Sequence, residues 1–206
     1  MRRFVRAASV TLLFAIGACS NSTAPDRIPP TIPPPLHGEV TDPAGDAVAD
    51  ARIAVSPDLV RATADVVTGS GSVTFVIQFA AGSFNRQTTR VSVLLDTDQD
   101  GSTGNRQVSG LGADYGLDLD AATGQAAVTK ANPPACAARL SCFDPLGLVP
   151  IIFAGDGMQV AVPLSLLGND DGRMNFQMSA YVMVASQTSV VVDFMPDSNL
   201  PPGRIQ

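Results

Sequence analysis

Apolar and polar residues alternate with a period of two along most of the chain after residue 72, as they do in strands that bury one face. The apolar stripes that this alternation predicts run through residues 73–79, 91–95, 115–119, 158–162, 174–184 and 190–194. Residues 148–153 are instead continuously apolar, which predicts a strand buried on both faces. Between these runs, only residues 163–168 indicate a short helical turn. Roughly eight or nine strands with this spacing predict an all-β fold, an antiparallel β-sandwich of the jelly-roll-like type.

The N-terminus has the layout of an export signal. Three arginines within the first six residues precede an uncharged, mostly apolar run at residues 7–16. This run is too short for a membrane-spanning helix, which needs about 20 apolar residues. It ends on Ile16-Gly17-Ala18-Cys19, which resembles the lipobox of bacterial lipoproteins.

The lipobox resemblance implies that residues 1–18 are a signal peptide and that Cys19 receives diacylglycerol and acyl chains such as palmitate. The lipid would hold the protein on a bacterial membrane of the cell envelope, facing the periplasm or the cell surface. Several acyl chains anchor a protein stably, at about 0.8 kcal/mol per buried methylene. The alternative is an ordinary signal peptide with a cysteine nearby by chance.

The segment that follows is rich in proline. Residues 19–37 contain six prolines, which disfavour helix and sheet and therefore predict an extended linker. His37, the only histidine of the chain, closes this linker, so we do not expect it to be a catalytic residue or a metal ligand. The remaining residues, 38–206, have the length of a single β-sandwich domain.

The charge balance of the mature chain is acidic. Without the three arginines of the signal, ten basic side chains face 19 acidic ones, a net charge of −9. Nucleic acid and anionic lipid head groups are therefore not expected as partners. An acidic surface suits both solubility and cation binding, and the charge alone does not choose between them.

Two cysteines remain in the mature chain. Cys136 and Cys142 are close in sequence, which in an oxidising compartment predicts a local disulfide. Closing so short a loop stabilises a fold by about 2–2.5 kcal/mol, enough to restrain one loop. A zinc site needs further cysteine or histidine ligands, which the domain lacks.

An acidic motif follows the apolar run at residues 91–95. Its carboxylates stand at alternate positions before Gly101, expected to form a sharp turn, and match the first seven positions of an EF-hand calcium loop. A strand precedes the motif instead of a helix, and Gln107 occupies the twelfth position, where a glutamate belongs. Asp114 and Asn105 are the nearest groups that could complete a shell. The ligand set expected for calcium is Asp96, Asp98, Asp100, Ser102 and Asp114. The alternative is an acidic turn in water.

Several short motifs also resemble a known family when taken in order. They are residues 41–46 (TDPAGD), 57–59 (PDL), 93–98 (VLLDTD), 103–104 (TG), 112–115 (GADY), 162–167 (VPLSLL) and 193–197 (DFMPD). Together they resemble the family 9 carbohydrate-binding modules and the DOMON-like domains over most of residues 40–198. The resemblance implies a jelly-roll-like sandwich with structural calcium and, in some members, a sugar-binding face. A second acidic group falls in the first two motifs: Asp42, Asp46 and Asp58.

The sequence indicates the fold of such a module more clearly than the ligand that it binds. Sugar-binding members stack the sugar ring on aromatic side chains, commonly tryptophan, and this chain has no tryptophan. Phe84, Phe143 and Tyr181 are the remaining candidates for a surface platform. Carbohydrate binding is therefore the alternative to a binding or structural module with an unknown protein or glycan ligand.

Catalysis is not expected from this inventory. The domain has no Gly-x-Ser-x-Gly motif and no histidine for a Ser/His/Asp or Cys/His site. Paired aspartates leave glycoside hydrolysis formally open, but the only glutamate, Glu39, lies at the edge of the domain.

Overall fold

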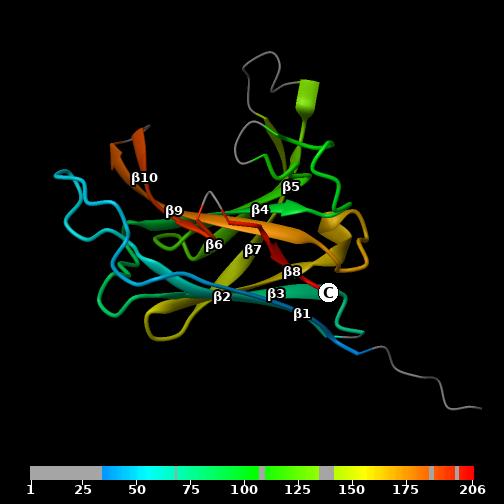
Figure 1. The fold of residues 1–206 in the computed structure, drawn as a ribbon, viewed down its shortest axis with the longest axis horizontal. Coiled ribbons are helices and arrows are strands. Elements are labelled where there is room, and N and C mark those ends of the chain that lie inside the picture. The colour runs from blue at the N-terminus through cyan, green and yellow to red at the C-terminus, as the bar shows by residue number, and fades with distance from the viewer. Residues whose placement is uncertain (1–33, 68, 107–109, 135–141, 186–187, 198–199) are drawn as a thin grey trace, which may run out of the picture. The chain divides into compact units, whose positions relative to one another are not determined.

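The computed structural model describes residues 34–67, 69–106, 110–134, 142–185, 188–197 and 200–206 (Figure 1). The secondary structure elements are β1 (Leu36–Thr41), β2 (Leu59–Val66), β3 (Ser72–Phe79), β4 (Thr89–Asp96), β5 (Tyr115–Asp120), β6 (Gln125–Ala131), β7 (Phe143–Phe153), β8 (Gly157–Pro163), the 3-10 helix η1 (Leu164–Leu167), β9 (Asn175–Ala185), β10 (Thr188–Met195) and β11 (Gly203–Arg204). The predicted all-β fold and its helical turn near residues 163–168 are confirmed. No helix in the described part of the chain has the length and hydropathy needed to cross a bilayer.

The strands form two antiparallel sheets that share β7. The path of hydrogen-bonded neighbours is β1-β2-β3-β8-β7-β6-β5-β4-β9-β10, with β11 paired to β9. β7 joins the sheets because its first residues pair with β6, whereas Ile151–Phe153 pair with β8. We call β1, β2, β3, β8 and the end of β7 sheet A. Sheet B comprises the first part of β7 and the strands β6, β5, β4, β9, β10 and β11. The predicted antiparallel β-sandwich is thus confirmed.

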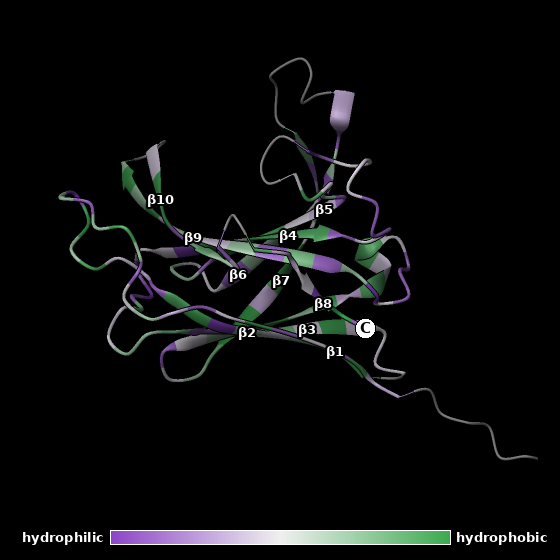
Figure 2. Cartoon of the chain, viewed as in Figure 1, coloured by the Kyte–Doolittle hydropathy of each residue, from purple (hydrophilic) through white to green (hydrophobic). Residues whose placement is uncertain are grey.

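The core lies between the two sheets and comes from the predicted alternation. Phe75 of sheet A and Phe176 of sheet B are fully buried and meet edge to face, with ring centroids 5.9 Å apart. Such a contact adds to the burial of both rings. The alternation of apolar and polar residues is visible along the strands in Figure 2. Met158, Met174 and Met178 are buried in the same cluster, as expected for core residues.

β7 differs from the prediction of a strand buried on both faces. Val149 and Ile151 are buried, but Leu148 and Ile152 are 67% and 60% exposed. An antiparallel sheet in a two-layer sandwich packs on the core with one face only, so the other face of β7 meets solvent. The continuous apolar run therefore did not indicate double burial.

β10 departs from strict alternation because it contains a bulge. The register to β9 shifts between Val191 and Asp193, so that Val192 and Asp193 are both buried. Phe194, which the alternation placed in the core, is 42% exposed, and Met195 is buried instead. A bulge inserts an extra residue and re-aims the side chains that follow. The prediction for Phe194 was wrong for this reason.

The C-terminal residues bond to both sheets. β11 pairs with β9, and the backbones of His37 and Gln206 exchange two hydrogen bonds of 3.3 and 3.2 Å. β1 begins at Leu36, two residues before the expected start of the domain at residue 38. His37, expected in the linker, lies on β1, and its Nδ1 is 2.7 Å from Asp65 Oδ1.

Gly38 allows the C-terminal residues to approach β1. A Cβ atom at Gly38 would lie 2.4 Å from the carbonyl oxygen of Arg204, a backbone atom that cannot move away cheaply. We expect Gly38→Ala to lower the free energy of unfolding by about 1–3 kcal/mol, as overpacking does. Urea denaturation of the full chain measures the change.

The matched control for this prediction is Gly147→Ala. The added methyl group would meet only the Leu166 side chain at 3.7 Å, an ordinary contact, so the change should stay within about 0.5 kcal/mol. If the two variants are equally stable, the backbone of Arg204 does not lie close enough to Gly38 to exclude a methyl group.

Candidate functional site

The acidic motif forms the connection between β4 and β5, which folds back on itself. Asn105 and Ala113 bond to each other through their backbones at 2.7 and 3.0 Å. A Cβ atom at Gly112 would lie 2.7 Å from Gly101 Cα, so glycine is needed where the two halves of the connection touch. Gly101 lies in a turn, as expected: the backbone N–H of Thr103 donates to the carbonyl oxygen of Asp100 at 2.9 Å, and Gln99 just before this turn has a left-handed φ of 57°.

Three of the five predicted ligands meet in this connection. One oxygen from each of Asp96, Asp98 and Asp114 lies within 4.8 Å of the others. Asp96 ends β4 and is 1% exposed. Asn175 donates a 2.9 Å hydrogen bond to Asp96 Oδ2, but no described residue donates to Oδ1. The cluster therefore contains a buried carboxylate oxygen that lacks a protein donor.

The environments of these three carboxylates differ. Asp114 Oδ2 accepts hydrogen bonds from the backbone and hydroxyl groups of Thr97, both at 3.0 Å. The backbone N–H of Asp100 and the hydroxyl of Thr103 donate to Asp98 and lower its pKa. Burial raises the pKa of Asp96, because the charged form loses its hydration. Asp96 is thus the group that gains most from a bound cation.

Asp100 and Ser102 do not join the other three. The backbone N–H and the hydroxyl of Ser102 donate to Asp100 Oδ1 at 2.9 and 2.6 Å, which lowers the pKa of Asp100. This local turn uses the alternating acidic pattern for backbone hydrogen bonding. The spacing of the motif could not distinguish a turn of this kind from a ligand shell.

The second acidic group contains more residues than the sequence indicated. Asp42 and Asp46 form one group with Asp197, and Asp46 and Asp58 form another with Asp193. Asp193 escaped the sequence analysis because strict alternation along β10 turns it toward solvent, and the bulge reverses that orientation. The contact between the β1–β2 connection, residues 42–58, and β10 joins segments far apart in the sequence, so no short motif predicts it.

A groove crosses the outer face of sheet B. It has a volume of about 560 Å³, and its lining includes Arg90, Asp118, Thr129, Phe143 and Tyr181. Two of the three predicted aromatic platforms thus share one groove. The third, Phe84, stacks on Phe79 and Phe153 with centroid distances of 4.9 and 6.2 Å. Phe84 therefore packs against the core.

Hydrogen bonds and an ion pair fix the positions of the polar side chains in the groove. The Tyr181 hydroxyl donates to Asp118 Oδ1, and burial with this contact raises the pKa of Tyr181. Arg90 lies beside Tyr181 in the register and pairs with Asp120 at 2.7 Å. A groove with an aromatic side and fixed polar groups has the composition of a small-ligand site.

The remaining predicted sites fall outside the described residues. Cys19, the signal at residues 1–18 and most of the linker belong to the undescribed N-terminal part. Cys136 is likewise outside the described residues, so its disulfide with Cys142 stays a prediction.

No protein-family model, curated protein or solved structure matches the chain. Its function is therefore inferred from the geometry of its own residues.

Proposed function

We propose that this chain is a lipid-anchored binding or structural module of the cell envelope and that calcium stabilises its β-sandwich. The observation that supports calcium is the buried Asp96 carboxylate, whose Oδ1 accepts no hydrogen bond from a described residue while Asp98 and Asp114 lie beside it. The anchor rests on the export signal and on Cys19.

Calcium fits the donors of the β4–β5 connection. It takes about six to eight oxygen ligands at about 2.3–2.6 Å, so oxygens of one shell lie within about 5 Å of one another. The three carboxylate oxygens satisfy this limit, being within 4.8 Å. A divalent cation also turns the repulsion between the carboxylates into attraction. Magnesium fits less well, because it demands a stricter octahedral geometry.

Calcium should raise the melting temperature of the protein, and Asp98→Asn should reduce the gain. Binding to the folded state alone adds about 2.7 kcal/mol at a hundredfold excess over Kd. Thermal melts of the full chain in chelator and in millimolar calcium give the gain for each variant. Comparing gains removes any direct effect of the substitution on stability.

The control for the calcium prediction is Asp171→Asn. Asp171 is an exposed aspartate whose Oδ1 accepts a 2.8 Å hydrogen bond from the backbone of Arg173, outside the β4–β5 connection. It should show the calcium gain of the wild type. If Asp98→Asn also keeps the full gain, the connection is a solvated acidic turn.

The anchor is tested separately by Cys19→Ala. Radiolabelled fatty acid should enter the wild type and not the variant, and the variant should lose membrane retention because a lipobox without its cysteine has no acceptor for diacylglycerol. A wild type that is secreted without label would contradict the proposed anchoring.

Carbohydrate binding is the second candidate, and the groove on sheet B favours it. Phe143 and Tyr181 lie in one groove with Arg90 and Asp118, which offer hydrogen-bonding groups to sugar hydroxyls. Gly116 lies beneath the Phe143 ring, where a Cβ atom would be in ordinary contact with Phe143 Cε1 at 3.5 Å. The two aromatic side chains in one groove are the observation that supports a platform without tryptophan.

A glycan array probed with the full chain tests this second candidate. Tyr181→Ala should weaken binding to the retained glycan at least about tenfold, the loss typical of an aromatic hot spot. The control is Ile152→Ala, which removes an exposed apolar side chain from β7 outside the groove. Equal binding by Tyr181→Ala and wild type, or no binding by the wild type, would point to a protein ligand or a structural role.

A further inference from the structure

Five aspartates from both sheets meet where the β1–β2 connection lies against β10. Asp42, Asp46 and Asp58 belong to the connection, whereas Asp193 is in β10 and Asp197 follows it. The backbone of Leu59, at the start of β2, donates a 2.6 Å hydrogen bond to Asp193 Oδ2. Val48 of the connection donates to the carbonyl oxygen of Val192 at 2.7 Å. The carboxylates are therefore held together by neighbouring backbone contacts.

Their oxygens form two overlapping groups. In one group, oxygens of Asp42, Asp46 and Asp197 lie within 4.8 Å of one another. In the other, the same limit holds for Asp46, Asp58 and Asp193. Asp46 is the only member that the groups share. Each group has the spacing of carboxylates around one calcium ion.

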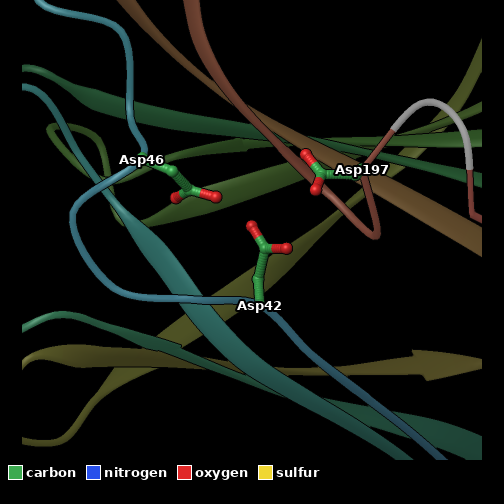
Figure 3. A group of neighbouring side chains, drawn as sticks. All are labelled: Asp42, Asp46 and Asp197. Atoms are coloured by element: carbon green, nitrogen blue, oxygen red, sulfur yellow. The ribbon is translucent and has the colours of Figure 1, made fainter.

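Each group contains a buried carboxylate oxygen that lacks a donor. Asp42 is 8% exposed, and neither of its oxygens accepts a hydrogen bond from a described residue. Figure 3 shows its carboxylate aimed between those of Asp46 and Asp197. Asp58 is 6% exposed, and its Oδ1 also lacks a donor among the described residues, although Gly45 donates to Oδ2. Burying unpaired charge is costly unless a counter-charge is present.

The described residues supply no such counter-charge. None of the ion pairs within the described part of the chain includes one of these five aspartates. Burial raises the pKa of Asp42 to about 6, and neighbouring Asp46 and Asp197 add to the shift. Burial likewise raises the pKa of Asp193 to about 7, although two backbone N–H groups oppose it. The cluster is therefore electrostatically unfavourable without a cation.

We propose that Asp42, Asp46, Asp58, Asp193 and Asp197 bind a pair of calcium ions, with Asp46 bridging the two. One ion would bind the group with Asp42 and Asp197, and the other the group with Asp58 and Asp193. A single ion would leave the buried carboxylate of the other group without a counter-charge. Two ions, one for each group, neutralise both. The ions hold the β1–β2 connection of sheet A against β10 of sheet B.

Calcium titration of the full lipidated chain, with the bound ions counted by native mass spectrometry, tests the pair. Asp46→Asn should lose two ions, because the bridge serves both groups. Asp197→Asn should weaken one ion at least tenfold and leave the other bound. The side chains of Asp46 and Asp197 are exposed and make no hydrogen bond that the described residues show, so neither substitution removes an internal contact.

The matched control is Asp50→Asn, in the same connection. Asp50 is paired with Arg52 at 2.7 Å, so it is already neutralised and should not affect the count of ions. Loss of one ion or none in Asp46→Asn would overturn the bridged pair. Asp98→Asn should change the number of bound ions only through the β4–β5 connection, whereas Asp46→Asn should change it only through the five aspartates beside β10. Failure of the calcium site in the β4–β5 connection is therefore distinguishable from failure of the bridged pair.

Trypsin tests whether the ions hold the connection in place. Arg52 is an exposed cleavage site within the connection, with 57% of its side chain accessible. Millimolar calcium should slow cleavage after Arg52 at least tenfold in the wild type, because binding suppresses local opening. Asp46→Asn should show no such protection. An unchanged rate in the wild type would overturn the holding role.

Discussion

The burial of one face of each sheet is the constraint on which the rest of the structure depends. Phe75 and Phe176 meet between the sheets, and the strands that carry them end at the margins of the core. β4 and β10 both pair with β9, the strand that carries Phe176; Asp96 is the last residue of β4, and Asp193 lies within β10. Asp96 and Asp193 therefore lose most of their hydration through packing that their apolar neighbours drive.

This packing buries carboxylates that no described basic side chain pairs with. Among the described basic residues, Arg61 pairs with Glu39 and Arg90 with Asp120, away from the acidic groups. The buried carboxylates instead face other carboxylates, in the β4–β5 connection and beside β10. The proposed calcium ions would neutralise these carboxylates reversibly, and the stability of the domain would then depend on the calcium concentration around it.

The sequence predicted the layers of the fold better than the composition of its sites. Strict alternation located Phe176 and Met178 in the core, because period two follows directly from strand geometry. It misplaced Phe194 and Asp193, because a bulge is set by pairing with β9 and has no local signal. Asp58 and Asp193 are far apart in sequence, so only the assembled sheets bring them together. The acidic motif at residues 96–102 likewise did not reveal that Asp100 turns to Ser102.

The pairing of the C-terminal residues bears on how the domain meets other copies of itself. A strand at a sheet edge offers unpaired backbone groups that a strand of another chain can extend. The bonds between His37 and Gln206, together with β11 on β9, occupy part of the edges of both sheets. This protection disfavours strand addition from neighbouring chains, which would matter most if the proposed lipid anchor gathers copies of the protein on a membrane.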